Sequence, residues 1–465
     1  MEQSFKGSCS HESVSKDGHD SPSNDRISHR DSFHDRINRL SAGKNHLGTR
    51  EAILLVTLGV LAGAISGLTL WAAEKLSYAQ VLLIKAKHLR ATPTYYFISA
   101  IVLAIIPALI IKYFCRQAAG SGLPEFKSIM AGEMKPSERA HLVSFRIFIA
   151  KIIGLSLSSG SGLSIGTEGP LVHISACIAH LLMSNISEFV DIVDSPSLSR
   201  QIFAASAAVG ISSAFNAPVG GLLFSVEITS TFYLISNYWK SFVASMAGAF
   251  ACSLFLFSRQ SAGQYGVALE MDISDTPYIK WELFIFLLIG LCFSYLAHWY
   301  LKLNQIVHLL MKPYCKKYPI VMCALVASIT AVVIYYTRAH TPSGLRVFSI
   351  AGDVLTSGKV AEMRSFKFIP PLVGVLVMAI TRTFITMLGF NLPIPAGTFV
   401  PVFLIGALLG RFVGLLVAMN STLDVYMPGY AIVGGCAFAS GVTQSISVAV
   451  VAIELTGNYF MLLHV

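Results

Sequence analysis

Long stretches without any charged residue run through the chain and constrain its fold more than any other feature. At least seven of them contain 18 or more residues each. The hydrocarbon core of a bilayer is about 30 Å thick, and about 20 helical residues cross it. We therefore expect an all-α polytopic membrane protein embedded in a lipid bilayer. The seven stretches are Ala52–Ala73, Ala91–Ile111, Gln201–Val226, Ser241–Ser258, Tyr318–Thr337, Thr383–Gly410 and Val425–Ile453.

Several of these stretches are too long for one membrane span and too short for two. Glycine and proline interrupt them, with Gly210 and Pro218 in the third stretch and Pro393 and Pro395 in the sixth. Broken helices at membrane depth are tolerated only where they line a cavity or pack inside protein. The pattern indicates a transport fold rather than a simple bundle of spanning helices.

The composition excludes several classes of protein. Apolar residues make up 54% of the chain and charged residues only 13%, against roughly 25% charged residues in soluble domains. Disordered, collagenous and nucleic-acid-binding proteins are excluded, despite the net charge of +9. The eight cysteines are scattered without a CxxC pair, so we expect neither a disulfide framework nor a zinc site.

Signals for an enzyme or a metal centre are weak. Gly162–Gly166 fits the GxSxG pattern of a hydrolase nucleophile, but no strand-rich sequence surrounds it, and His173 is the only base nearby. His173 and His180 have no third ligand close in the sequence, and the HExxH pattern is absent. We expect no enzyme activity, no cofactor and no bound metal ion.

The chain divides into a polar tail and a membrane region. Residues 1–49 lack apolar periodicity and predict a disordered tail. Basic residues without acids precede the first apolar stretch, which places the tail in the cytosol. We expect a first membrane repeat at 50–262, a connecting loop at 263–282 and a second membrane repeat at 283–465.

The membrane region repeats itself. Gly166–Pro170 has a counterpart in Gly397–Pro401, and the offset in residue number is 397 − 166 = 231. After a gap of four residues, Phe224–Thr229 similarly matches Val451–Thr456. Interrupted hydrophobic segments at matching places in two halves indicate inverted-topology repeats with a transport site near the middle of the membrane.

Three short motifs share a pattern suited to binding an anion. Gly120–Glu125, Gly166–Pro170 and Gly397–Pro401 each place a glycine in a short loop before a proline that leads into a helix. Free amides at helix N-termini attract anions, and three such ends aimed at one point would bind an anion without a full positive charge. The alternative is that these motifs are merely loop ends between membrane helices.

An acid inside one of these loops suggests a gate. The carboxylate of Glu168 would occupy the place of the anion until protonation or competition releases it. The alternative is that Glu168 caps its own helix.

Four further charged residues lie in apolar surroundings. Lys151 and Arg382, related by the same offset of 231, are expected to raise the local potential for anions. The alternative is a structural role, in which they extend to the membrane surface or bond carbonyls at helix ends. Glu227 and Glu454 are expected to be structural partners of helix termini rather than transport groups.

Together with Asn216–Gly221 and Glu454–Gly457, the three motifs resemble those of the CLC family of chloride channels and chloride/proton exchangers, over about residues 50–460. The resemblance implies an inverted-repeat fold of tilted and broken helices, and a homodimer with one path per subunit for chloride and other small anions. By position, Glu168 would be the gate. The residues implied to bind chloride are Ser121, Gly122, Gly166, Thr398, Phe399 and Tyr459.

One position narrows the implied function. Exchangers of this family carry a Glu-Glu pair for the proton, whereas this chain has Glu227-Ile228, and Ile228 cannot titrate. The surrounding sequence resembles the plasma-membrane channel branch, which implies a passive, voltage- or pH-gated anion channel. A chloride/proton exchanger is the alternative. Thr167 stands where the family often has a lysine, which would change conductance or gating.

The end of the chain also departs from the family pattern. Leu455–Val465 contains 11 residues, or about half the length of a helix that crosses a bilayer. We therefore expect a truncated form that ends inside the last helix and lacks the paired cystathionine-β-synthase-like domains. A non-conducting isoform that acts only through dimerisation is a further alternative.

Overall fold

The computed structural model describes most of the membrane region. The expected tail at 1–49, the connecting loop at 263–282 and Tyr459 lie outside the described residues, apart from Thr49, Trp281 and Glu282 at the segment ends. The described residues are 49–85, 92–132, 136–185, 196–229, 236–258, 281–338, 371–420, 425 and 427–456.

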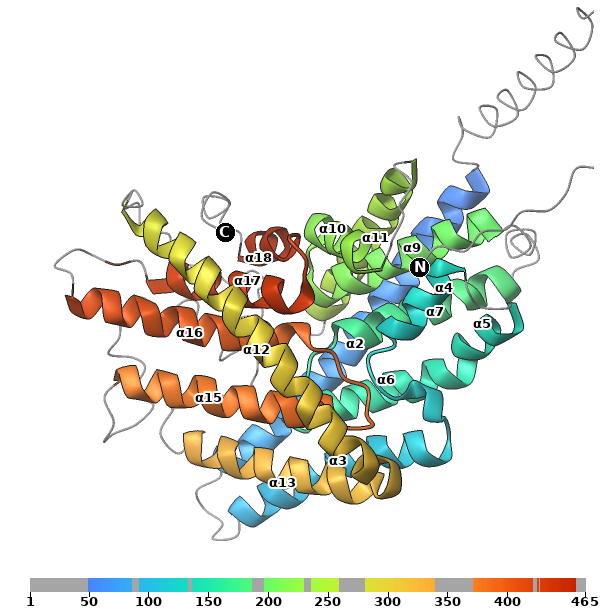
Figure 1. Cartoon of the computed structure of the whole chain (residues 1–465). Helices are drawn as coiled ribbons and strands as arrows, with labels where there is room; N and C mark the ends of the chain where they lie inside the picture. The colour runs from blue at the N-terminus through green and yellow to red at the C-terminus, as the bar shows by residue number, and fades with distance from the viewer. Residues whose placement is uncertain are drawn as a thin grey trace, which may run out of the picture. The chain divides into compact units, whose positions relative to one another are not determined.

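Helices follow one another along the described parts of the chain, and no strand separates them (Figure 1). The helices of the first half are α2 (Thr49–Lys85), α3 (Thr92–Tyr113), the 3-10 helix η1 (Arg116–Ala118), α4 (Leu123–Ala131), α5 (Pro136–Leu142), α6 (Phe145–Gly160), α7 (Glu168–Asn185), α9 (Pro196–Phe215), α10 (Pro218–Thr229) and α11 (Ser236–Ser258). The helices of the second half are α12 (Glu282–Lys317), α13 (Pro319–Arg338), α15 (Pro371–Phe390), α16 (Phe399–Asn420), α17 (Met427–Thr443) and α18 (Val448–Thr456).

The two halves place their helices in the same order. The starts of α7 and α16, at Glu168 and Phe399, are separated by an offset of 399 − 168 = 231. The starts of α9 and α17, at Pro196 and Met427, are separated by the same offset, since 427 − 196 = 231. The repeat that the sequence predicts is therefore confirmed, with the same offset.

The long apolar stretches are broken where prolines or polar residues interrupt them. α9 ends at Phe215 and α10 begins at Pro218, while α15 ends at Phe390 and α16 begins at Phe399. Within the described residues, the helices α10 and α18 contain 12 and 9 residues, which is about 18 and 14 Å of helix and less than the thickness of the bilayer core.

The expectation that Gly210 interrupts its stretch was wrong, because α9 continues through it. A Cβ atom on Gly210 would lie 2.6 Å from the Cα of Val172. The glycine therefore serves close packing of α9 against α7 and does not end the helix.

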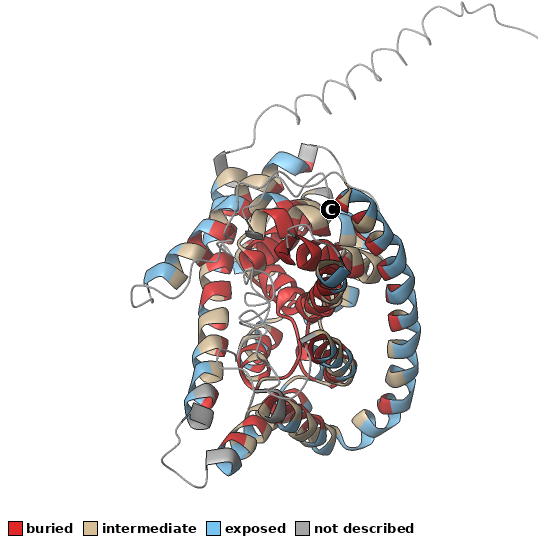
Figure 2. Cartoon of the chain, turned by 90° about the vertical axis from the view of Figure 1, so that its left-hand side faces the viewer, coloured by how far each residue is buried: buried red, intermediate tan, exposed pale blue. Residues whose placement is uncertain are grey.

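Seven helices among the described residues are long and apolar enough to cross a membrane, and the chain is a multi-pass membrane protein. Figure 2 shows buried residues concentrated in the central helices, with exposed residues along the outer faces. The seven candidate spans are Glu51–Gln80, Thr94–Tyr113, Ser137–Gly160, Asn237–Ser258, Glu282–Lys317, Leu372–Phe390 and Phe399–Asn420.

Glycines spaced four residues apart bring two pairs of helices close together. In α2 they are Gly59, Gly63 and Gly67, which face α11, and a Cβ on Gly59 would lie 2.5 Å from the carbonyl oxygen of Ala244. In α16 they are Gly406, Gly410 and Gly414, which face α17. Small residues at this spacing let helix backbones approach closely, which is how membrane helices pack without a hydrophobic driving force between them.

The short helices α10 and α18 are antiparallel, and each caps the other. Glu227, near the end of α10, accepts hydrogen bonds from Ile446 N at 2.8 Å, Ser447 N at 2.9 Å and the Ser447 hydroxyl, just before α18. Glu454, near the end of α18, accepts from Val219 N at 3.2 Å and Gly220 N at 2.7 Å in α10. Carboxylates stabilise helix N-termini by pairing free amides and opposing the helix dipole. The prediction that both glutamates are partners of helix termini is confirmed.

Candidate functional site

The first candidate motif turns sharply into α4. Gly122 is the N-cap of this helix with φ of +80°, and Pro124 lies in the first turn, as the sequence predicts. The amide of Leu123 donates to the Ser121 hydroxyl oxygen at 3.3 Å. A side chain on Gly122 would also collide with Lys151, whose Nζ would lie 2.6 Å from the added Cβ. Only glycine fits both the backbone angle and the space.

The second and third motifs meet backbone to backbone. Gly166 N donates to Gly397 O, and Gly397 N donates to Gly166 O, both at 2.7 Å. The two glycines occupy the same position in the repeat, so the local two-fold axis passes between them. This pair of bonds places the N-termini of α7 and α16 next to each other.

Glu168 lies at this junction and bonds to the opposite half of the molecule. It is 4% exposed, and its Oε1 accepts a hydrogen bond from Val400 N at 3.3 Å, in the first turn of α16. Its other oxygen, Oε2, is buried without a hydrogen-bond partner. That oxygen lies against both bridging glycines, since a Cβ on Gly397 would come within 2.5 Å of it. The carboxylate therefore binds at the N-terminus of α16.

The first motif joins the other two through separate contacts. Gly120 N donates to Ile394 O at 3.1 Å, in the loop that leads to α16. Ser121 packs against the start of α7, because a Cβ on Gly169 would lie 2.7 Å from the Ser121 Cβ. The three loops are therefore linked pairwise, and the starts of α4, α7 and α16 converge around Glu168.

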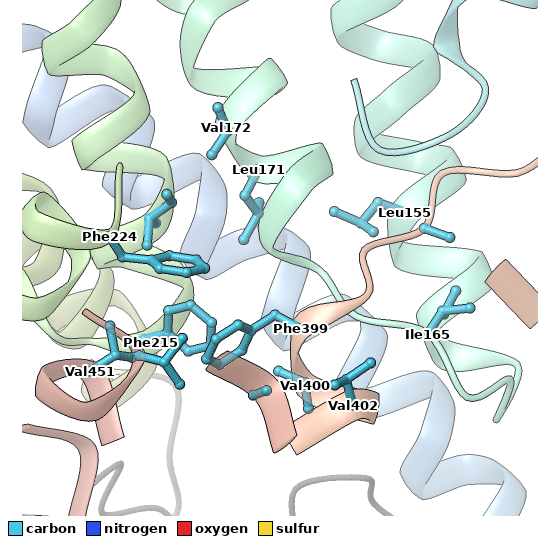
Figure 3. Close-up of a cluster of buried hydrophobic side chains, with 14 of the residues drawn as sticks. Leu155, Ile165, Leu171, Val172, Phe215, Phe224, Phe399, Val400, Val402 and Val451 are labelled. Carbon is cyan, nitrogen blue, oxygen red and sulfur yellow. The ribbon is translucent and has the colours of Figure 1, made fainter. Parts of the chain in front are cut away.

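Aromatic rings enclose the start of α16 on one side. The ring of Phe399 makes edge contacts with Phe215, at 4.8 Å between centroids, and with Phe224, at 5.1 Å. Figure 3 shows these three rings directed toward one another, with Val451 beside them. The packing fixes the first turn of α16 and excludes water from that side of the junction.

A buried cation lies behind Gly122. Lys151 on α6 is 0% exposed, and its Nζ lies 2.8 Å from Nδ1 of His173 on α7. His173 Nε2 lies 2.8 Å from the carbonyl oxygen of Leu142, which can only accept a hydrogen bond. Nε2 therefore carries the proton, and Nδ1 accepts a hydrogen bond from the Lys151 amine. Burial excludes the interpretation in which Lys151 extends to the membrane surface, and Arg382, at 8% exposure, is also buried.

The structure brings together most residues that the sequence marks as a site. The exception is Tyr459, which is outside the described residues. The sequence analysis did not predict that His173 is the partner of Lys151. Its position in the second turn of α7, just after the glycine loop, could have indicated that it lies close to the site. The residues that meet at the junction are Ser121, Gly122, Gly166, Glu168, Thr398 and Phe399.

Two chloride channel proteins that are similar to this chain are much longer than it. Chloride channel protein F of Dictyostelium discoideum is 32% identical over 373 residues, which cover 77% of this chain and 45% of the relative. Human chloride channel protein 2 is 30% identical over 448 residues, which cover 89% of this chain and 49% of the relative. The chain thus spans about half the length of these relatives.

Solved structures share the fold. A eukaryotic CLC transporter matches with a TM-score of 0.72 and 28% identity, over 89% of this chain and 70% of that one. A slow cyanobacterial Cl⁻/H⁺ antiporter matches with a TM-score of 0.74 and 17% identity, over 90% of this chain and 92% of that one. The family model for voltage gated chloride channels matches residues 102–465. With its two repeats and converging helix N-termini, the chain belongs to the voltage-gated chloride channel (CLC) family.

Proposed function

We propose that this protein is a passive chloride channel whose anion path passes the junction of α4, α7 and α16. The observation that carries the proposal is the pairwise linkage of the three loops around one buried carboxylate. Helix N-termini supply partial positive charge, and the buried Lys151 adds a positive potential from behind Gly122. The ligands proposed for chloride are Ser121, Gly122, Gly166, Thr398, Phe399 and Tyr459.

Glu168 is the proposed gate. Its carboxylate is an anion that accepts a hydrogen bond from an amide at the start of α16, as a permeant chloride would. Besides Val400 N, the backbone amides of Thr167 and Phe399 lie close to the carboxylate, and a chloride ion would bind to the same amides. Chloride competing for the amides, or a proton on the carboxylate, would displace it. Voltage and external pH are therefore the expected controls of opening.

A chloride/proton exchanger is the second candidate, because similar solved structures are named as transporters or antiporters. The channel is favoured by what surrounds Ile228. The acid next to it, Glu227, accepts bonds from both amides that precede α18 and from the Ser447 hydroxyl. An acid engaged in capping a helix is a poor proton carrier, and a hydrocarbon side chain carries none.

The oligomeric state, the membrane and the orientation of the channel are also proposals. We infer a homodimer with one path per subunit, a plasma-membrane location and a cytosolic N-terminus. The resemblance of the sequence motifs to the CLC family implies the first two, and the basic residues before α2 support the third.

Chloride efflux from liposomes tests the proposed function. The purified chain is reconstituted with internal chloride, and efflux is measured before and after addition of the potassium carrier valinomycin. A passive channel releases chloride only when potassium can follow, since charge balance limits the flow. Absence of efflux above protein-free liposomes would overturn the proposal for this chain, and efflux of cations alone would do so too.

A further inference from the structure

The C-terminal half of α12 holds the loop that leads into α16. Three residues of α12 contact one residue of that loop, Asn391, which directly follows α15. The Asn304 Oδ1 and His308 Nδ1 atoms lie 3.1 and 2.9 Å from the Asn391 side-chain amide, and the Cys315 thiol lies 3.7 Å from the Asn391 carbonyl oxygen. Residues 304, 308 and 315 are spaced by four and seven positions, so they share one helix face.

The hydrogen-bond directions in this cluster are determined by chemistry. The carbonyl oxygen of Met387, 2.7 Å from the Asn391 side chain, can only accept, so the atom facing it is Nδ2. The second hydrogen of Nδ2 goes to Asn304 Oδ1. Oδ1 of Asn391 is then an acceptor, and His308 must donate from Nδ1. All polar atoms of the Asn391 side chain are engaged, and two of its three bonds go to α12.

Asn391 begins the loop that connects to every part of the junction. Three residues further on, Ile394 O accepts from Gly120 N at 3.1 Å. Pro395 O accepts from the Ser158 hydroxyl at 3.1 Å, and Gly397 pairs with Gly166. A shift at the start of this loop would therefore move the amides at the start of α16, one of which binds Glu168.

We propose that His308 is a positioning residue for the anion site, and that it acts through Asn391. Hydrogen bonds are directional, so the Asn304–His308 pair fixes the place of Asn391 along α12 more sharply than apolar contacts would. His308 is exposed and its hydrogen bond goes to Asn391, so its effect at the junction is transmitted through the loop. The functional part of this inference rests on the proposed anion path, whereas the structural part does not.

Three variants of the full chain test the proposal. His308→Ala removes the donor. His308→Asn retains it, because an asparagine amide nitrogen occupies nearly the position of Nδ1 in histidine. His298→Ala is the matched control, since His298 is also an exposed histidine of α12, ten residues earlier in the sequence.

The first readout is hydrogen–deuterium exchange of the Gly120 and Gly397 amides, both of which donate to backbone carbonyls. Loss of one ordinary hydrogen bond changes a local opening equilibrium about fivefold. We expect exchange to speed up about fivefold in His308→Ala and to remain at the wild-type rate in the other two variants. Equal rates in all four proteins would overturn the proposal, as would faster exchange in His298→Ala.

The second readout is the chloride concentration that gives half-maximal efflux from liposomes. His308→Ala should raise it severalfold, with rescue in His308→Asn, whereas a purely structural loss would lower the amount of active protein without changing this concentration. An unchanged value in His308→Ala, with efflux present, contradicts the positioning role. If none of the proteins conducts, the proposed function fails, and the exchange rates alone decide whether His308 holds the loop.

Discussion

The two loops that meet on the local two-fold axis have nearly the same backbone and very different side chains. Glu168 and Phe399 occupy the same position of the repeat, because 168 + 231 = 399. In the first half this position carries a carboxylate that reaches across to the second half, and in the second half it carries a ring packed among phenylalanines. Duplication thus provides two helix N-termini, and divergence gives one half the carboxylate that we propose as the gate and the other half a ring that packs against phenylalanines of the opposite repeat.

The largest effect is expected at this pair of positions. Glu168→Gln removes the charge that is proposed to compete with chloride, so the currents should stay open across the voltage range and should not depend on external pH. Phe399→Leu leaves Glu168 in place, so the currents should still depend on voltage and on external pH. Looser packing around residue 399 should change the conductance only slightly. Patch-clamp recording of the two variants measures this difference.

If Glu168→Gln keeps the voltage and pH dependence of the wild type, the carboxylate is only a cap for α16. The asymmetry between the two loops would then be structural, with no part in gating.

The buried cations should give the next largest effect. Lys151 lies behind Gly122 with His173 as its partner, whereas Arg382, at the equivalent position of the repeat, is buried on α15. A unit positive charge about 8 Å from an anion contributes about 2 kcal/mol to the free energy of anion binding at an effective dielectric constant of ~20. Lys151→Met should therefore weaken chloride binding roughly tenfold or more.

Arg382→Met is the comparison, with a smaller expected change, because Lys151 is the cation that lies directly behind Gly122. The chloride dependence of conductance measures both variants. Equal effects would mean that the two halves contribute equally to the potential at the site.

The smallest effect is expected where the halves are most alike. Glu227 and Glu454 each cap the other's helix through two backbone amides, since Val219 and Gly220 correspond to Ile446 and Ser447 at an offset of 446 − 219 = 227. Glu227 also accepts from the Ser447 hydroxyl. Glu227→Gln and Glu454→Gln should each cost about 1–2 kcal/mol of stability, because each weakens at least two charged hydrogen bonds. Thermal unfolding of the purified variants measures the loss of stability. Strongly unequal losses in the two variants would contradict the view that the two caps are equivalent.

The sequence predicts those parts of the site that are formed by residues close together in the chain. Glycine followed by proline marks the start of each helix at the junction, and the repeat offset predicts that two of these starts are equivalent. Contacts between distant residues could not be predicted. Lys151 and His173 are 22 residues apart on different helices, and the amide that binds Glu168 belongs to a residue 232 positions later. Gly210 misled because a glycine that permits close helix packing and one that ends a helix look alike in a sequence.

The reversal potential of the chloride current under an imposed pH gradient, at fixed chloride, tests the passive anion path most directly. Ile228 provides no proton site, and Glu227 is engaged with the start of α18. The current should therefore reverse at the chloride equilibrium potential whatever the proton gradient, even if the open probability changes with pH. A reversal potential that moves with the proton gradient, or uphill proton movement driven by chloride, would contradict the channel and require an exchanger.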